Sequence, residues 1–356
     1  MNNRAWIEIN SNNLLNNLKL LQSCQHNRQV MAVVKDNFYG LGLDAIKLII
    51  ENGVNFLAVS TIDEAIKLRE ANISQDILIL GYVPISKLNL VKKYDLIQTL
   101  ITYDYAKECY HFNPNLKYHL KINTGMNRLG INYQQLDDIM WCYQHLNIQG
   151  IFSHLLAADQ FSQDAKEMNL LQINRYNSVL NYLKNKNVCH GITHLFNSAG
   201  SLIYGKDYNY DYIRPGIAFC GDSQFDGLKP VVKLITKISD IKCLKPQQHF
   251  GYGIENITNR DLKIATITIG YGDGLFRALS FKNYQVMINK QLCPLIGRMC
   301  MDQALVDITN ISEVSLDDIV EILNEDLTLE TMANCLNTIP NEIMTHLNIR
   351  LERFIK

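Results

Sequence analysis

Short apolar runs alternate with amphipathic stretches through the first two thirds of the chain. The run QVMAVVK at 29–35 precedes the helical pattern LDAIKLIIENG. The run FLAVS at 56–60 precedes TIDEAIKLREANI, which opens with a threonine suited to cap a helix. This order of strand, helix, strand, helix continues along the chain. Further apolar runs begin near residues 76, 96, 118, 148, 192 and 211.

These eight runs are continuously apolar, as expected for parallel strands that are covered on both faces. A half-exposed antiparallel sheet would instead show alternation of apolar and polar residues. Eight parallel strands that alternate with helices predict an α/β fold, a (β/α)8 barrel of the TIM type, for residues 11–227.

Beyond residue 228 the pattern changes to strand-like segments with short connections and few helical patterns between them. It predicts a mainly antiparallel β domain over residues 228–356, with one helical region near 327–347. The isolated strand-like WIEIN at 6–10 precedes the first barrel helix, and we expect segment 1–10 to join this second domain. The expected strands lie in the segments 231–244, 262–272, 284–300 and 304–309.

Charge and composition narrow the class of partner. The chain has 34 basic and 35 acidic residues, so nothing indicates a nucleic-acid groove or an anionic membrane surface, and a small, weakly charged partner is favoured. The first ten residues lack the apolar core of a signal peptide, and no apolar run is long enough to span a bilayer. We therefore expect a soluble cytoplasmic protein. Nine cysteines without a CxxC pair indicate neither a disulfide framework nor a metal site.

Polar residues follow the predicted barrel strands, at the end of the barrel where chemistry is found in this architecture. Taken singly, each is more simply explained as a solvated lysine, a core histidine or a surface arginine. Together, at one mouth, they predict a site. The residues concerned are Lys35 after the first strand, Lys121 and Arg128 around the fifth, His154 after the sixth, His194, Asn197 and Ser198 after the seventh, and Arg214 after the eighth.

The chemistry of these residue types favours one kind of ligand. Lys35 ends a buried-looking strand, and lysine is the nucleophile of Schiff-base chemistry. The segments NSAG at 197–200 and RPG at 214–216 offer backbone N–H groups that can hold a phosphate. A phosphorylated aldehyde needs both features.

The stretch AVVKDNFYGLG at 32–42 resembles the lysine motif of the alanine racemases, which belong to the fold-type III pyridoxal-phosphate enzymes. The similarity extends over nearly the whole chain, and the motifs follow the family's order. It implies a barrel followed by a β domain, pyridoxal 5'-phosphate as cofactor, and interconversion of L-alanine and D-alanine, which supplies D-alanine for peptidoglycan. The other matching motifs are KINTGMNRLGI, GIFSHLLAAD, HLFNSAG, IRPGIAFCG, GYG, IGYGDG and GRMCMDQ.

The resemblance also implies roles for single residues. Lys35 would carry the cofactor covalently, which removes the cost of a free buried ammonium. Arg214 would face the pyridine nitrogen, with His194 behind it and His154 beside the ring. Because a guanidinium keeps its proton, the cofactor would be a weaker electron sink and reprotonation at Cα would be favoured. The residues that would hold the phosphate side of the cofactor are Tyr39, Asn197, Ser198, Gly216 and Ile217.

Racemisation needs two acid/base groups on opposite faces of Cα. The resemblance implies Lys35 for one face and Tyr252 for the other. In relatives, Tyr252 and the residues that narrow the entrance come from the partner subunit, which implies a homodimer with shared active sites. The residues expected to contact the substrate are Arg128, Tyr271, Met301 and Asp302, and Lys121 matches a lysine that is carbamylated in some relatives.

Departures from the family pattern leave the substrate open. Asp36, Phe38 and Leu41 differ from the usual motif, and Ile349 stands roughly where some relatives carry a tyrosine on the phosphate side. A serine-preferring or broad-specificity racemase is the first alternative. A non-catalytic pyridoxal-phosphate-binding protein is a weaker one, because such single-domain barrels lack the β domain. The related decarboxylases typically carry a glutamate where Arg214 stands.

Overall fold

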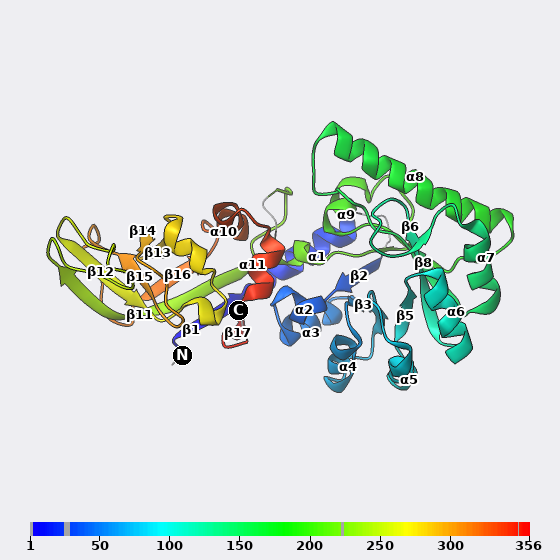
Figure 1. The fold of residues 1–356 in the computed structure, drawn as a ribbon, viewed down its shortest axis with the longest axis horizontal. Helices are drawn as coiled ribbons and strands as arrows, with labels where there is room; N and C mark the ends of the chain where they lie inside the picture. The colour runs from blue at the N-terminus through cyan, green and yellow to red at the C-terminus, as the bar shows by residue number, and fades with distance from the viewer. Residues whose placement is uncertain (1–2, 25–28, 222–223, 348) are drawn as a thin grey trace. The chain divides into compact units, whose positions relative to one another are not determined.

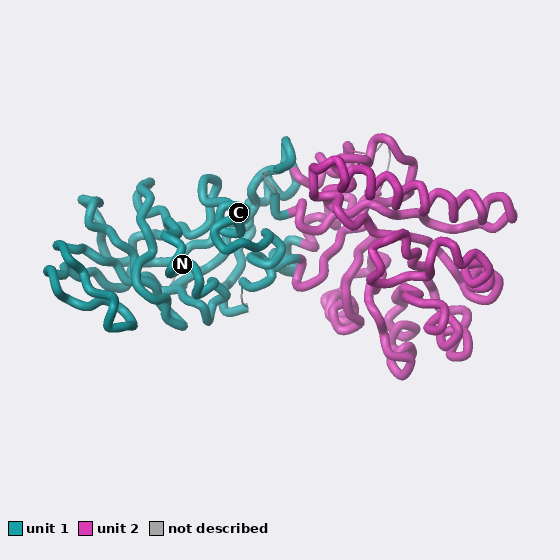
Figure 2. Tube along the Cα trace, turned by 45° about the horizontal axis from the view of Figure 1, so that its top comes forward, with its two compact units in different colours: residues 1–16, 39–45, 220–356 teal, residues 17–38, 46–219 magenta. Residues whose placement is uncertain are grey.

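The computed structural model describes residues 3–24, 29–221, 224–347 and 349–356. The chain divides into two compact units, shown in teal and magenta in Figure 2. We call residues 17–38 and 46–219 the barrel unit, and residues 1–16, 39–45 and 220–356 the β unit. The short segment 39–45, just after Lys35, therefore belongs to the β unit although both of its neighbours in sequence lie in the barrel unit.

The barrel unit contains a closed barrel of eight parallel strands (Figure 1). Each strand pairs with its neighbour in sequence order, and the barrel closes because β10 pairs with β2. This confirms the predicted fold class and each of the eight predicted strands. The strands are β2 (Gln29–Val33), β3 (Phe56–Val59), β4 (Asp76–Ile79), β5 (Ile97–Leu100), β6 (Lys117–Asn123), β8 (Ile148–Phe152), β9 (Ile192–His194) and β10 (Tyr212–Ile213), and β7 (Ile131–Asn132) pairs with β6 outside the ring.

The continuous apolar runs have a direct structural reason. All residues of β3 and β5 are buried, because one face of each strand fills the barrel interior and the other is covered by helices. Figure 1 shows helices on the outer side of the strands. They are α1 (Ser11–Ser23), α3 (Leu43–Glu51), α4 (Ile62–Glu70), α5 (Leu88–Lys93), α6 (Tyr103–Phe112), α7 (Leu136–His145), α8 (Gln163–Asn185) and α9 (Ser198–Tyr204), with 3₁₀ turns η1 (Ile85–Lys87) and η2 (Ile217–Cys220).

Helix α4 begins as the sequence predicts. The Thr61 side chain accepts a hydrogen bond from the backbone N–H of Glu64, and the Glu64 carboxylate accepts one from the backbone N–H of Thr61. This reciprocal capping box satisfies N–H groups that have no partner within the helix. It also fixes the Glu64 carboxylate next to the end of β2, where Lys35 follows.

The β unit is built on an eight-stranded sheet with the order β12-β15-β14-β13-β16-β11-β1-β17. An additional pairing of β12 with β11 closes six of these strands into a ring. All pairings are antiparallel except that of β1 with β17. The strands are β1 (Ala5–Ile9), β11 (Val232–Leu244), β12 (Leu262–Ile267), β13 (Gln285–Ile288), β14 (Gln291–Ile296), β15 (Ala304–Asp307), β16 (Ile319–Leu323) and β17 (Glu352–Ile355).

Strand β1 pairs with β11 on one side and with β17 on the other, so both ends of the described chain meet in one sheet. Two strands, β16 and β17, lie outside the segments predicted from the sequence. The predicted helical region forms two helices, α10 (Leu329–Leu336) and α11 (Pro340–His346), and the turns η3 (Tyr271–Asp273) and η4 (Arg277–Phe281) connect strands. Among the described residues, no helix is long and apolar enough to cross a membrane.

Candidate active site

The chain leaves strand β2 through an unusual turn at Lys35. Residues Asp36, Asn37 and Phe38 have φ and ψ values between 43° and 57°, and Tyr39 has a φ of 52°. This segment, α2 (Lys35–Tyr39) in Figure 1, is a left-handed turn, although the side chains of L-residues disfavour that conformation by roughly 1–2 kcal/mol per residue. This left-handed turn was not predicted from the sequence. Such local strain persists only where surrounding contacts enforce it.

Two sets of contacts within the barrel unit hold this turn. The Glu64 carboxylate accepts a hydrogen bond from the backbone N–H of Asp36 at 2.6 Å while it also caps α4. The Phe38 ring is fully buried and packs edge-on against Phe219, with ring centroids 5.2 Å apart. The backbone that follows Lys35 is therefore held by one hydrogen bond, to Glu64, and by the packing of one ring, that of Phe38.

Within the β unit, Arg353 holds the next part of the chain. Its guanidinium donates hydrogen bonds to the carbonyls of Gly40, Leu347 and Leu351. Gly40 has a φ of +78°, and a Cβ there would lie 2.6 Å from the carbonyl oxygen of Met344. The glycine of the lysine motif is therefore required by backbone conformation and by a close approach to the C-terminal segment.

Lys35 lies near charges of both signs. Burial lowers the pKa of its amino group, and the nearby positive charge of Arg128 lowers this pKa further, while Glu64 and Asp36 act in the opposite direction. An amine with a lowered pKa has a larger neutral, nucleophilic fraction near neutral pH. This is the state that attack on a carbonyl carbon requires.

The structure brings together the ends of strands β2, β6, β8 and β10. Burial and the charges of Lys121, Arg214, Arg128 and Lys35 all lower the pKa of His154 well below its usual range, so four cationic groups surround this imidazole. These residues were predicted to lie at one mouth of the barrel because they lie near the ends of its parallel strands in sequence. Such a concentration of positive charge is suited to bind a small anion.

Lys121 is buried in β6, and its Nζ lies 4.4 Å from the centroid of the Phe152 ring. Burial lowers the pKa of this amine well below its usual value, and Arg214 and Arg128 add to the effect. In the described part of the chain, no nearby carboxylate opposes this shift. A lowered pKa raises the neutral fraction of this amine, and only the neutral amine acts as a nucleophile.

Arg214 is held rigidly inside the barrel. It is only 3% exposed and donates hydrogen bonds to the carbonyls of Ser153 at 2.7 Å and Leu195 at 2.9 Å. It also contacts Nδ1 of His194 at 2.8 Å and Nδ1 of His154 at 3.3 Å. With four protein partners, the guanidinium is fixed in place before any ligand binds.

Ser198 joins the segments that follow β9 and β10. Its hydroxyl oxygen accepts hydrogen bonds from the backbone N–H groups of Gly216 at 3.0 Å and Ala218 at 3.3 Å, and Ile217 lies between them in sequence. A hydroxyl and two backbone N–H groups thus converge at one point, as in sites that bind phosphate oxygens. Asn197 caps α9 by accepting the N–H of Gly200 at 3.0 Å, so its side chain organises this segment.

The remaining predicted residues lie in the β unit. Tyr39 is buried, whereas Tyr252 is 66% exposed on the loop 250–257, and Tyr271 and Met301 are also exposed. The backbone N–H of Tyr271 donates to the carbonyl of Cys300, and Arg298 pairs with Glu255. The loops that carry Tyr252, Tyr271, Met301 and Asp302 are therefore neighbours.

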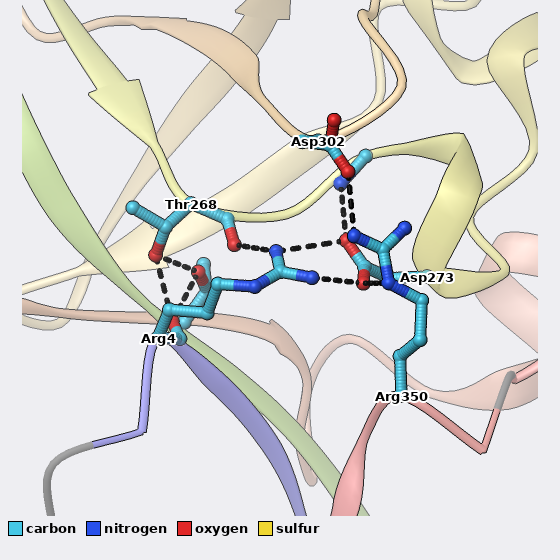
Figure 3. A network of polar contacts seen from close by, with 7 residues as sticks. Arg4, Thr268, Asp273, Asp302 and Arg350 are labelled. Atoms are coloured by element: carbon cyan, nitrogen blue, oxygen red, sulfur yellow. Dashed lines mark hydrogen bonds and ion pairs between the residues drawn. The ribbon is translucent and has the colours of Figure 1, made fainter.

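A polar network supports these loops from within the β unit (Figure 3). The Asp273 carboxylate is fully buried and forms ion pairs with Arg4 and Arg350. Arg350 also donates to the Asp302 carboxylate at 2.6 Å. This network connects the first strand, the turn η3 and the C-terminal segment to the loop of a predicted substrate-binding residue.

Some residues of the site were missed, although the sequence held a signal for two of them. His119 lies two positions before Lys121 in β6, and side chains two apart in a strand point to the same face. Glu64 is marked by the capping pattern TIDE. Arg353 and Asp273 were not predicted, because their contacts with Gly40 and Arg4 join positions that are 313 and 269 residues apart in the sequence.

Two family models match this chain. Residues 9–224 match the family model of the alanine racemase N-terminal domain, and residues 231–355 match that of the C-terminal domain. Together these two matches cover most of the chain. The chain belongs to the alanine racemase family. The chain is also 34% identical to alanine racemase 1 of Clostridium acetobutylicum, over 98% of this chain and 94% of that protein.

Solved structures of alanine racemases share the fold. The structure of the enzyme from Clostridium difficile 630 has a TM-score of 0.92 and 28% identity, covering all of this chain and 96% of that one. A second, from Bartonella henselae with covalently bound pyridoxal phosphate, has a TM-score of 0.89 and 27% identity, covering 99% of this chain and all of that one.

These matches confirm the resemblance inferred from the motifs, and they identify the chain as a racemase enzyme. The match to the C-terminal domain model shows that the chain carries a second domain of this family beside the barrel. The similarity between this chain and the alanine racemases does not depend on a few motifs, because it extends over both domains.

Proposed function

We propose that this protein interconverts L-alanine and D-alanine with pyridoxal 5'-phosphate bound covalently at Lys35. The observation that carries the proposal is the group of four cationic residues that act on His154, one of which is Lys35, together with the lowering of the Lys35 pKa by burial and by Arg128. Membership of the alanine racemase family supports the same conclusion.

The residues present fit this cofactor. The O–H of Ser198 can donate to a phosphate oxygen beside the N–H groups of Gly216 and Ala218, which donate to the Ser198 oxygen, and we assign Tyr39 and Ile217 to the same end. Arg214 would face the pyridine nitrogen, with His194 behind it and His154 beside the ring. Asn197 would act by capping the helix that presents Ser198. The lysine, these phosphate-side groups and the arginine together match a phosphorylated pyridine aldehyde.

When bound, the cofactor joins the amino group of the substrate and withdraws electrons from Cα, which makes the Cα proton acidic. Arg214 would limit this effect, because its guanidinium can donate a hydrogen bond to the pyridine nitrogen but does not transfer its proton. Its four protein contacts keep it in place during turnover. We infer that this limit favours return of a proton to Cα over side reactions.

Proton transfer then falls to two residues. We propose that the Nζ atom of Lys35 takes or gives the proton on one face of Cα and that the Oη atom of Tyr252 does so on the other. Arg128 would bind the substrate carboxylate, and Tyr271, Met301 and Asp302 would shape the entrance. The sign of the Lys35 pKa shift supports its role as base, because a neutral amine is required.

We further propose that Lys121 is carbamylated. The neutral form of the buried amine adds to carbon dioxide and loses a proton, and the resulting carbamate would place a negative charge near Arg128 and Arg214. Intact-mass analysis at neutral pH, with and without bicarbonate, should detect the added mass, and the Lys121→Arg variant should lack it.

We also propose a homodimer in which Tyr252, Tyr271, Met301 and Asp302 complete the site of the partner subunit. The exposure of Tyr252, Tyr271 and Met301 on the isolated chain supports this, because large exposed side chains on neighbouring loops are common at interfaces. In this proposal the barrel domain spans residues 11–227 and the β domain residues 228–356, together with segment 1–10. The enzyme would act in the cytoplasm and supply D-alanine for peptidoglycan.

The covalent assignment is tested by borohydride reduction of the yellow purified protein, followed by peptide mass analysis. The pyridoxyl mass should lie on the peptide that contains Lys35, and Lys35→Ala should abolish it. Lys87→Arg, at an exposed lysine of η1, is the matched control and should label normally. A label on another lysine of the parent protein contradicts the assignment. A chiral assay of L-alanine, L-serine and other L-amino acids identifies the substrate.

The shared site is tested by mixing two inactive variants. Lys35→Ala and Tyr252→Phe homodimers should each be nearly inactive, and the second should still bind cofactor. After joint unfolding and refolding, a mixed dimer would place both defects in one site and leave the other intact, so about a quarter of the parental sites should recover. If subunit exchange is demonstrated and no activity returns, each site is built from one chain.

A further inference from the structure

Three buried side chains form a line through the interior of the barrel unit. Arg214 donates a hydrogen bond to Nδ1 of His194 at 2.8 Å, and Nε2 of His194 lies 2.9 Å from Nδ1 of His119. Both histidines are fully buried. Arg214 comes from the end of β10, His194 from β9 and His119 from β6.

The chemistry of the groups fixes the direction of every hydrogen bond in this line. A guanidinium can only donate, so Nδ1 of His194 must be the unprotonated, accepting nitrogen. The single proton of the neutral His194 ring therefore sits on Nε2 and is donated to His119. Consequently Nδ1 of His119 is the acceptor, and its own proton sits on Nε2.

The line ends at His119. Within the described residues, Nε2 of His119 has no hydrogen-bond partner, although it is buried. A buried N–H without an acceptor is costly, and a structural core position would normally hold an apolar side chain instead. The ring also has a dedicated space, because a Cβ at Gly150 would lie 2.6 Å from its Cε1 atom.

We propose that His119 is a positioning residue that fixes the tautomer of His194 and thereby holds Arg214 for the reaction. Without an acceptor at position 119, the Nε2–H group of His194 has no hydrogen bond that favours this tautomer. The alternative tautomer would direct an N–H of His194 toward the N–H groups of Arg214 and push the guanidinium away. The inference rests on the proposed role of Arg214 at the pyridine nitrogen.

The test uses two substitutions of nearly equal shape. In His119→Asn, the side-chain oxygen can accept from Nε2 of His194 at about the place of Nδ1. In His119→Leu, a methyl group takes that position and no acceptor remains. Both variants lose the imidazole and its packing, so a purely structural role predicts similar losses for the two.

We expect His119→Asn to retain kcat within a few-fold, whereas His119→Leu should lose roughly ten-fold or more in kcat with a smaller effect on KM, because Arg214 acts on the reaction rather than on substrate binding. Equal kcat values for the two variants would overturn the proposal. Parent activity in the same assay separates this outcome from a failure of the proposed racemase function.

A second measurement does not depend on activity or on the stability of the variants. In the cofactor-free parent protein with ¹⁵N-labelled histidine, two-bond ¹H–¹⁵N correlations should show His194 as the Nε2–H tautomer, assigned by its loss in His194→Gln. In His119→Asn this tautomer should persist, and in His119→Leu the Nδ1–H form should appear. A parent His194 that carries its proton on Nδ1 would refute the inference even if neither variant folds.

Discussion

The network in Figure 3 allows burial and charge to be separated experimentally. Asp273 and Asp302 both pair with Arg350, but the Asp273 side chain is fully buried, whereas that of Asp302 is 55% exposed. Replacing each aspartate by asparagine removes one negative charge and keeps the shape of the side chain. The two substitutions therefore differ mainly in the environment of the lost charge.

The expected size of the effect follows from the contacts of Asp273. Its carboxylate accepts the N–H of Gly270 at 3.1 Å and two N–H groups of Arg4, one of them at 3.0 Å. Asparagine can keep one acceptor, but its amide NH₂ would face the Arg4 guanidinium. Losing such a charged hydrogen bond costs about 1.5–3 kcal/mol. Breaking a wholly buried ion pair costs about 3–5 kcal/mol, which is an upper bound because Arg4 is 40% exposed to water.

We therefore expect Asp273→Asn to lower the free energy of unfolding of the β unit by about 2–3 kcal/mol. Asp302→Asn should leave it unchanged within error, since exposed pairs contribute little. The chain has two tryptophans, so Trp141→Phe leaves Trp6 in β1 as the only tryptophan, whose fluorescence can be excited selectively over that of the tyrosines. Urea titrations of both variants in this background, at one protein concentration, provide the comparison. Equal losses for the two variants would refute the argument from burial.

Three further predictions concern the barrel unit. Asn37→Gly should be more stable than Asn37→Ala by about 1 kcal/mol in urea unfolding, because only glycine adopts the left-handed backbone freely; the reverse order would contradict the strain. Thr61→Ala should lose about 1 kcal/mol with its cap, and Thr61→Ser should not. Burial lowers the pKa of His119 in the folded protein to about 3, whereas the unfolded chain takes up a proton on this histidine below about pH 6.5, so the folded state loses stability as pH falls through that value. His119→Asn should therefore flatten the decline in the free energy of unfolding between pH 7.5 and 5. An unchanged slope would contradict this.

The barrel was predictable because its strands are continuously apolar and separated by helical patterns. Every residue of β3 and β5 is buried, which is the property that the sequence pattern records. Strand β17 was missed for a physical reason, which does not apply to β16 with its buried Val320 and Ile322. β17 has no fully buried residue, and it forms a strand because β1, more than 300 positions away, provides its pairing partner. Such long-range pairing leaves little trace in local sequence.

The candidate site likewise has features that the sequence predicts and features that it does not predict. Lys35, Lys121, His154 and Arg214 could be placed together because each lies in or just after the C-terminal end of a barrel strand, and parallel strands end at one mouth. The left-handed turn after Lys35 could not be predicted, because phenylalanine and tyrosine have no preference for that conformation. It is imposed by the clamp of Glu64 and by the packing of the Phe38 ring.

The turn at Lys35–Tyr39 also has a stereochemical consequence. Its backbone has the hand that L-residues avoid and that D-residues, as their mirror images, prefer. A D-residue introduced at the exposed position 37 by chemical ligation would therefore relieve strain, whereas in an ordinary helix it would add strain. The segment that follows the lysine is thus built of L-residues but has the backbone conformation that D-residues favour.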